Sequence, residues 1–313
     1  MHAGSAMDPD VSVVVPVHNE AKVLRRNTER LSEYLTATVP SHEIILCENG
    51  SLDGTDSIAE DLSKEYENVE FLGLPEAGLS DALRSGFLAS KGEKIVYFPI
   101  DLSVDLSFIP ESVRLLDMFD TVVGSKRLAS TLDRRPRVRR AFSRAYHGLV
   151  RGLYDVDLSD TTCVKAYRRS KLLDLIDRVP TSSGVYETEL LVEAGAEGFD
   201  IVEVPVTVEE NRPSREVLSF KVRRKLEDLL SARLDFVSFI VGFPLFTVGV
   251  ASLLVLVLGK LSSSGFSGFT NPYTFLIAML LVISGFQIIV FGLLSNLMIQ
   301  IRKEITRSVQ GGG

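Results

Sequence analysis

Short apolar runs alternate with longer amphipathic segments over the part of the chain before residue 216. Continuous apolar runs of this length are typical of buried parallel strands, which we expect at 11–16, 43–48, 69–73, 94–98, 120–124 and 201–206. Between them apolar side chains recur every three or four positions, which predicts helices at 20–37, 55–66, 78–90, 108–117, 139–153, 168–177 and 186–197. The alternation predicts an α/β fold with a mainly parallel sheet that helices cover on both faces.

The last third of the chain has a different pattern, with two long stretches that carry no charge. The first extends from Phe236 to Leu258 and the second from Tyr273 to Ile301. A helix needs about 20 apolar residues to cross a bilayer, and a soluble helix of this length does not need apolar faces all round. We therefore expect an integral membrane protein with two transmembrane helices within 236–301, rather than a buried hairpin of a soluble core.

Flanking charge predicts the orientation of these helices. Basic residues precede the first helix and follow the second, whereas the connecting loop is nearly uncharged; they are Lys221, Arg223, Arg224, Lys225, Arg233, Arg302, Lys303 and Arg307. The positive-inside rule then predicts that both termini and the catalytic domain are cytoplasmic. Residues 216–235 form an amphipathic pattern, which predicts an interfacial helix on the membrane surface.

These patterns divide the chain into a disordered leader (1–10), a cytosolic domain (11–215), the interfacial helix (216–235), the membrane helices (236–301) and a cytosolic tail (302–313). The net charge of −7 gives no reason to expect nucleic-acid binding. The two cysteines fit a reducing compartment, and Cys47 ends an apolar run, as a buried structural thiol would. The sequence leaves open whether the chain forms a homo-oligomer.

Polar turns follow the first two expected strands. The first turn reads PVHNE and contains Pro16, Asn19 and Glu20; the second reads ENGSLDGT and contains Glu48, Asn49 and Ser51. Ligands in open α/β sheets bind beyond the carboxyl ends of the strands, so both turns lie where a nucleotide would bind. A dinucleotide-binding fold is disfavoured because no G-x-G-x-x-G follows the first strand.

This pair of turns resembles the opening of the family 2 glycosyltransferases, whose GT-A fold is a Rossmann-like, mainly parallel sheet that binds a nucleotide-diphospho-sugar. The alternative is a generic Rossmann-like sheet. The resemblance implies that the turn residues bind the nucleotide, although Asn49 replaces a more usual acid. It extends to Gly78, whose helix start leaves backbone amides free for a phosphate or sugar oxygen, or serves only as a helix cap.

Relatives have an acidic D-x-D motif that holds a divalent metal against the nucleotide diphosphate, and here it reads Pro99, Ile100 and Asp101. The resemblance therefore implies one metal ligand, Asp101, for Mg²⁺ or Mn²⁺. These ions commonly keep waters and substrate phosphates as ligands, so one carboxylate can suffice, with lower affinity. Asp105 either contributes or is a solvated loop acid.

Residues 122–151 are unusually basic for an acidic protein. The stretch resembles the acceptor loop of the polyprenyl-phosphate and dolichyl-phosphate sugar transferases, which implies that Lys126, Arg127, Arg139 and Arg140 bind the acceptor phosphate; the alternative is a solvated charge run. The later stretches DLSDTTCVKAYRR and ENRPSRE resemble the same branch, which implies that Lys165, Arg212, Ser214 and Arg215 lie near the donor diphosphate. The first of them is one residue short, which leaves the role of Asp160 open, and Glu189 either orients basic residues or caps its helix.

The resemblance implies transfer of a hexose from a nucleotide sugar, of UDP-glucose or GDP-mannose type, to a membrane polyprenyl or dolichyl phosphate on the cytoplasmic face. Asp101, Lys165 and Arg127 are the expected catalytic residues. A processive polysaccharide synthase is disfavoured because the chain has no tryptophan for a Q-x-x-R-W motif. A degenerate nucleotide-sugar-binding membrane subunit without activity and a transferase with another lipid acceptor stay open.

Overall fold

The computed structural model describes residues 8–128, 158–179, 186–208, 234–262 and 272–310. The chain divides into two compact units, Met1–Lys225 and Leu226–Gly313.

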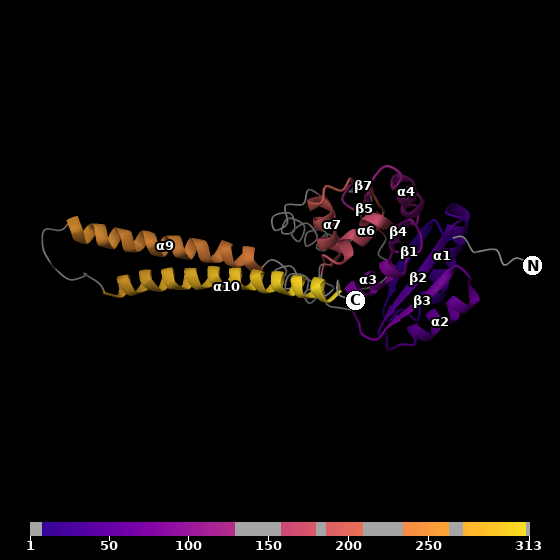
Figure 1. The fold of residues 1–313 in the computed structure, drawn as a ribbon, viewed down its shortest axis with the longest axis horizontal. Helices are drawn as coiled ribbons and strands as arrows, with labels where there is room; N and C mark the ends of the chain where they lie inside the picture. Colours follow the sequence, from indigo (N-terminus) through magenta and orange to yellow (C-terminus); the bar gives the residue numbers. More distant parts are fainter. Residues whose placement is uncertain (1–7, 129–157, 180–185, 209–233, 263–271, 311–313) are drawn as a thin grey trace, which may run out of the picture. The chain divides into compact units, whose positions relative to one another are not determined.

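The first unit contains a seven-stranded sheet in the order β3-β2-β1-β4-β6-β5-β7 (Figure 1). Its strands are β1 (Val11–Val17), β2 (His42–Asn49), β3 (Val69–Leu74), β4 (Lys94–Tyr97), β5 (Thr121–Ser125), β6 (Lys165–Arg168) and β7 (Ile201–Pro205). All neighbouring strands pair in parallel except at β6, which runs antiparallel to β4 and β5. The predicted mainly parallel α/β sheet is therefore confirmed.

Strand β6 is absent from the strands predicted by the pattern. It has only four residues, Lys-Ala-Tyr-Arg, with a charge at each end. Because it runs against its neighbours, its first residue, Lys165, pairs with Tyr97 of β4 and Val123 of β5. Reversal of this one strand brings Lys165 towards the edge at which the parallel strands end.

Helices cover both faces of the sheet and enclose two apolar cores. One core includes residues of α1 (Leu24–Thr38), α2 (Thr55–Glu65) and α4 (Phe108–Leu115); the other includes residues of α3 (Leu79–Ala89), α6 (Arg169–Ile176) and α7 (Tyr186–Ala196). In β1, Val13 and Val15 belong to the first core and Val14 belongs to the second. A strand that is buried on both faces is continuously apolar for this reason.

Close approach of α3 to the sheet depends on Gly86. A Cβ atom at this position would lie 2.5 Å from both the Cys47 sulfur and a methyl group of Val14. The Cys47 thiol is buried, and burial raises its pKa to about 12. The expectation that Cys47 is a buried thiol is therefore confirmed, and its chemistry is that of a small apolar side chain.

The second unit consists of two long helices, α9 (Leu234–Ser262) and α10 (Pro272–Gln310). Each includes a segment of 23 residues, Val237–Gly259 and Tyr273–Ser295, that is long and apolar enough to cross a membrane. Only 11% and 17% of their most apolar windows are buried within the protein. Both helices are therefore apolar mainly on surfaces that the described protein does not cover.

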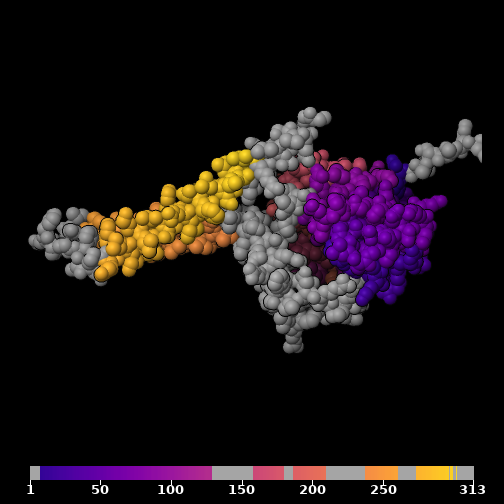
Figure 2. All heavy atoms as spheres, turned by 90° about the horizontal axis from the view of Figure 1, so that it is seen from below, coloured from indigo at the N-terminus to yellow at the C-terminus, as the bar shows by residue number. Residues whose placement is uncertain are grey.

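Helices α9 and α10 lie side by side (Figure 1 and Figure 2), and glycines allow their backbones to approach closely. A Cβ atom on Gly242 would lie 2.8 Å from the carbonyl oxygen of Gly285, and one on Gly249 would lie 2.7 Å from the amide nitrogen of Val282. Small residues at such contacts are characteristic of packed membrane helices. There they let the backbones approach closely, and van der Waals packing rather than the hydrophobic effect favours association.

Candidate active site

The turns after β1 and β2 are hydrogen-bonded to each other. The Asn19 amide donates to Ser51 Oγ at 2.8 Å, and the Leu52 amide donates to Asn19 Oδ1 at 2.9 Å. The Glu20 amide donates to Thr55 Oγ1 at 2.8 Å. Asn19 has a φ of 54°, in the left-handed region that asparagine tolerates better than most residues. The two motifs therefore form one structural unit, in which Asn19, Glu20 and Ser51 lie side by side.

Buried polar side chains at the end of β2 hold the second turn in place. Glu48 accepts a hydrogen bond from the Ser51 amide at 2.6 Å. The Asn49 side chain donates to the Val17 carbonyl at 3.1 Å and accepts from the Gly78 amide at 3.4 Å. An ionised aspartate could accept the second bond but could not donate the first. Asn49, in place of the usual acid, therefore ties the turns after three strands together.

Two further predicted nucleotide-binding residues lie around this unit. Pro16 is within β1, opposite Cys47 of β2. Gly78 immediately precedes α3, and its amide already faces the Asn49 side chain. Gly50 has a φ of 62°, and a Cβ atom there would lie 2.9 Å from the Ala77 amide nitrogen, so only glycine fits between the two turns.

Asp101 follows β4 and is half-buried. Its Oδ1 atom accepts a hydrogen bond from the Ser103 amide at 3.0 Å, and the buried Asn27 side chain donates to the Ile100 carbonyl at 2.9 Å. Leu102 has a φ of 48°, an uncommon value for a leucine, so this loop is held in a strained shape. The loop thus presents the Asp101 carboxylate from a fixed backbone.

One carboxylate is a small ligand set for a divalent metal. Among the described residues, no group of three or more His, Cys, Asp or Glu is arranged to hold a metal ion. Mg²⁺ is commonly held by one or two carboxylates together with waters and substrate phosphates. The donors around Asp101 therefore fit a metal that binds together with a nucleotide diphosphate, and not a metal held by protein ligands alone.

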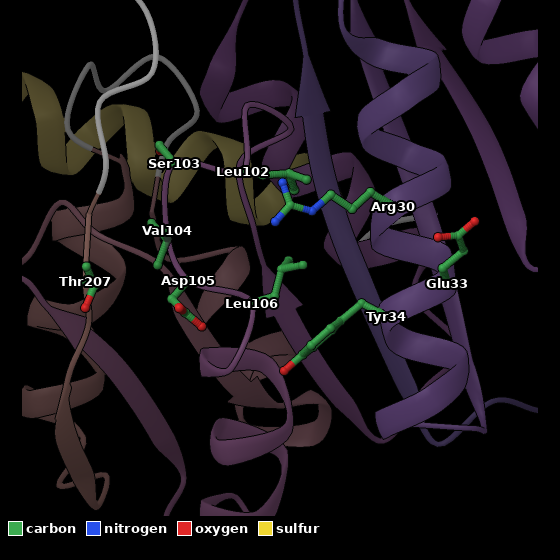
Figure 3. Close-up of a pocket in the computed structure, with 9 residues that line it drawn as sticks. All are labelled: Arg30, Glu33, Tyr34, Leu102, Ser103, Val104, Asp105, Leu106 and Thr207. Atoms are coloured by element: carbon green, nitrogen blue, oxygen red, sulfur yellow. The ribbon is translucent and has the colours of Figure 1, made fainter.

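A pocket of about 670 Å³ lies between α1 and the loop after β4 (Figure 3). Arg30 and Tyr34 extend from α1 towards this loop. Asp105 also lines the pocket and accepts a hydrogen bond from the Ser107 amide at 2.8 Å. Hydrogen bonds from Ser107 hold the pKa of the Asp105 carboxyl below its usual range. Asp105 therefore has a structural partner at the entry to α4, as expected for a loop acid.

Lys126 follows β5 and forms a buried ion pair with Asp160. Its ammonium lies 2.8 Å from Asp160 Oδ2 and 3.1 Å from Thr162 Oγ1. Burial opposes ionisation of Asp160, but the Lys126 ammonium and the hydrogen bonds from Thr162 together outweigh it and lower the pKa of this carboxyl. Asp160, whose role the shortened motif leaves open, is therefore the partner of a predicted acceptor-binding cation.

Lys165 is almost completely buried, with 1% of its side chain exposed. Its ammonium lies 2.6 Å from Glu187 Oε2, 2.8 Å from the Cys163 carbonyl and 5.7 Å from the centre of the Tyr97 ring. These three groups surround a cation that has three donors. Lys165 therefore lies beneath the surface of the site. Its partner is Glu187, a residue that the sequence motifs do not single out.

The remaining predicted residues differ in what the structure says of them. Arg127 directly follows Lys126 and is half-buried. Five predicted site residues lie outside the described residues: Arg139, Arg140, Arg212, Ser214 and Arg215.

Residues 12–176 match the model of glycosyl transferase family 2. Glycosyltransferase AglD of Haloferax volcanii is 34% identical over 65% of this chain and 34% of its own length. Polyprenol monophosphomannose synthase of Mycolicibacterium smegmatis is 29% identical over 63% of this chain and 77% of its own length. Dolichyl-phosphate beta-glucosyltransferase of Saccharomyces cerevisiae is 22% identical over 72% and 75%, respectively. The chain thus spans about a third of the length of AglD, and the relatives confirm the resemblance to the polyprenyl-phosphate branch.

A solved structure of glucosyl-3-phosphoglycerate synthase from Mycobacterium tuberculosis, in complex with Mn²⁺, uridine diphosphate and phosphoglyceric acid, is similar with a TM-score of 0.53. It is 22% identical, and the match covers 71% of this chain and 78% of that one. At this identity the likeness concerns the fold alone, and it confirms the predicted GT-A fold.

Proposed function

Because this chain belongs to glycosyl transferase family 2, we propose that it transfers a hexose from a nucleotide sugar to a polyprenyl or dolichyl phosphate. The donor is of the UDP-glucose or GDP-mannose type. The relatives whose names specify a lipid-linked monosaccharide product, a dolichyl-phosphate glucosyltransferase and a polyprenol monophosphomannose synthase, support this acceptor class.

One observation carries the proposal: two polar turns, Asp101 and the buried Lys126 all follow strands that end at the same edge of the sheet. The turns containing Asn19 and Ser51 follow β1 and β2, Asp101 follows β4, and Lys126 follows β5. Strands β1, β2 and β4 pair in parallel. Strand β5 has the same direction, because β6 runs antiparallel to both β4 and β5. The carboxyl ends of all four strands therefore face the same edge. Ligands of open α/β sheets bind at this edge.

The acceptor chemistry makes modest demands on the protein. A lipid phosphate is already anionic at neutral pH, so its oxygen can attack the sugar without a general base. The protein must align two anionic substrates and stabilise the departing nucleotide diphosphate, chiefly by positioning and electrostatics. A site with basic side chains and the half-buried carboxylate of Asp101 suits these tasks.

We assign the roles accordingly. Asp101 would hold a divalent metal, Mg²⁺ or Mn²⁺, which neutralises the diphosphate. Lys126 and Arg127, with Arg139 and Arg140, would hold the acceptor phosphate. Arg212, Ser214 and Arg215 would hold the donor diphosphate. Lys165 is assigned a positioning role, because Glu187 and the Cys163 carbonyl already occupy its ammonium.

The apolar helices α9 and α10 support a membrane-bound enzyme, since its acceptor is itself a membrane lipid. In the proposed arrangement the domain 11–215, the interfacial segment 216–235 and both termini face the cytoplasm. Protease added to intact cells should leave the domain uncut. Cleavage under these conditions would reverse the proposed topology.

Direct assay of the full chain tests the activity. Detergent-solubilised protein is incubated with polyprenyl phosphate and, separately, labelled UDP-glucose, GDP-mannose, UDP-galactose and UDP-N-acetylglucosamine. We expect transfer of label to the lipid fraction from at least one donor, lost on chelation of divalent metals. Nucleotide binding without transfer from any donor would favour the non-catalytic subunit instead.

A further inference from the structure

Glu203, in the edge strand β7, accepts several hydrogen bonds from one short segment. Both of its carboxylate oxygens lie 2.9 Å from the Ser159 amide nitrogen. Oε1 also lies 2.7 Å from Ser159 Oγ and 3.2 Å from the Asp160 amide nitrogen. The Glu203 carboxylate thus fixes the backbone at Ser159 and Asp160.

Asp160 in turn fixes the Lys126 ammonium. Its Oδ2 atom lies 2.8 Å from that group, while Oδ1 accepts hydrogen bonds from the amide and hydroxyl of Thr162 at 3.0 and 3.1 Å. Only 4% of the Asp160 side chain and 10% of the Lys126 side chain are exposed. In such a low-dielectric setting the position of each charge depends strongly on its partner.

A second path leads from Glu203 to the backbone after Lys126. The hydroxyls of Ser159 and Ser125 are 2.5 Å apart, and Ser125 Oγ accepts hydrogen bonds from the Arg127 amide at 3.3 Å and the Leu128 amide at 3.4 Å. Glu203 therefore reaches Lys126 from both sides: through the Asp160 charge and through the backbone of the turn after β5.

We propose that Glu203 is a positioning residue for the acceptor phosphate, which acts by holding Asp160 and, through it, the Lys126 ammonium. This inference rests on the proposed function, because it needs Lys126 to bind a phosphate. If Glu203 served only to hold the edge strand β7 in place, its substitution would change the stability of the protein. Binding of the acceptor phosphate to the folded protein would then stay unchanged.

Glu203→Gln is the first test, since it keeps the shape and turns an acceptor oxygen into a donor that faces the Ser159 amide. Binding of a short-chain polyprenyl phosphate to the full chain in detergent should weaken by roughly tenfold, because charge-assisted hydrogen bonds to the carboxylate are lost. UDP and GDP affinity should stay within about twofold. Glu203→Asp should restore part of the loss, and Glu65→Gln, at an exposed ion pair on α2, is the matched control.

A double-mutant cycle with Lys126→Ala decides how Glu203 acts. If Glu203 acts through Lys126, adding Glu203→Gln to Lys126→Ala should weaken lipid-phosphate binding no further. Fully additive losses would overturn the inference. Where Glu203→Gln does not fold, Ser159→Ala replaces it in the cycle, because it removes the hydroxyl path alone and should give a smaller, still non-additive loss. Failure of the unmodified protein to bind any polyprenyl phosphate would refute the proposed function itself, and with it this inference.

Discussion

The edge of the sheet at which the parallel strands end is built in two different ways. On the side of β1, β2 and β3, uncharged groups such as Asn19, Asn49 and Ser51 hydrogen-bond to backbone and to one another, and the buried Glu48 carboxylate accepts a hydrogen bond from the Ser51 amide. On the side of β5 and β6, the buried ion pairs Lys126–Asp160 and Lys165–Glu187 hold the strands and loops together. We refer to these as the neutral side and the charged side.

The difference affects how each side tolerates change. A neutral hydrogen bond contributes about 0.5–1.5 kcal/mol, and water can replace a lost partner at a half-exposed turn. Breaking a buried ion pair by removing one partner costs about 3–5 kcal/mol, because an uncompensated charge stays buried. Substitutions on the charged side should therefore cause large losses of stability, whereas those on the neutral side should cause only small losses of stability and of nucleotide affinity.

Asp101 differs most sharply from the buried ion pairs of the charged side, because it is a charged residue without a buried partner in the described part of the chain. Asp101→Ala should lower sugar transfer by at least about a hundredfold, as loss of an electrostatic group at the reacting centre does. Its thermal unfolding midpoint should hardly move, because within the described residues this half-buried carboxylate accepts a hydrogen bond only from the Ser103 amide. Transfer assays and thermal unfolding of the full chain in detergent measure both effects.

Asp105→Asn is the matched control, since Asp105 is a neighbouring acid that caps the turn before α4. It should retain most activity. If Asp101→Ala were as active as the unmodified protein, or if transfer survived complete chelation, the proposed role of Asp101 as a metal ligand would be wrong.

Lys165→Met tests the charged side where burial is greatest. The substitution leaves the Glu187 carboxylate beside a buried apolar chain, so we expect a loss of about 3–5 kcal/mol in stability. Thermal unfolding of the full chain in detergent should show a much lower midpoint. The double variant Lys165→Met with Glu187→Leu should recover much of the loss, because it removes both charges.

Lys64→Met is the control for this prediction, because Lys64 forms an exposed ion pair with Glu60 at 2.7 Å. Exposed pairs contribute about 0–1 kcal/mol, so the midpoint should change little. Equal losses from Lys165→Met and Lys64→Met would remove the distinction between buried and exposed charge on which the comparison depends.

The two sides also differ in how well the sequence predicts them. The apolar runs predicted six of the seven strands, since buried parallel strands have a clear local pattern. The seventh, β6, is short, ends in charged residues and exists because β4 and β5 lie on either side of it. Its formation depends on tertiary pairing, which a local pattern does not contain.

The same reasoning applies to the site. Asn19 and Ser51 belong to recognisable turns after neighbouring strands, so their proximity follows from the parallel sheet. The partner of Lys165 depends on which side of α7 faces β6. Residues two apart on a helix face different directions, so only one of Glu187 and Glu189 can point towards Lys165 in this way. The contacts of Glu203 with Ser159 likewise depend on strand order and have no motif of their own.

Lowering the pH should protonate Asp160, break its ion pair with Lys126 and so lower the stability of the fold. Burial alone would raise the pKa of this carboxyl, but the Lys126 ammonium and the hydrogen bonds from Thr162 together outweigh burial, so the pKa is lowered in the folded protein. A carboxyl with a lowered pKa stabilises the fold above its ordinary pKa of about 3.9, and this stabilisation is lost as pH falls through the folded value. The midpoint of thermal unfolding should therefore fall more steeply below about pH 4 in the unmodified protein than in Asp160→Asn. Identical slopes would show that Asp160 does not contribute to acid sensitivity.

Ser51→Ala should have the smallest effect, because it removes one uncharged hydrogen bond on the neutral side. The Asn19 amide loses its partner Ser51 Oγ, at 2.8 Å, but this half-buried turn lets water replace it. We expect a loss of about 0.5–1.5 kcal/mol in stability and a reduction of a few-fold in nucleotide affinity. Ser63→Ala, which removes an exposed hydroxyl bond within α2, controls for the loss of a hydroxyl alone. A loss for Ser51→Ala as large as that for Lys165→Met would mean that the neutral turns are as sensitive as the buried ion pairs, and that the two sides of the edge do not differ in kind.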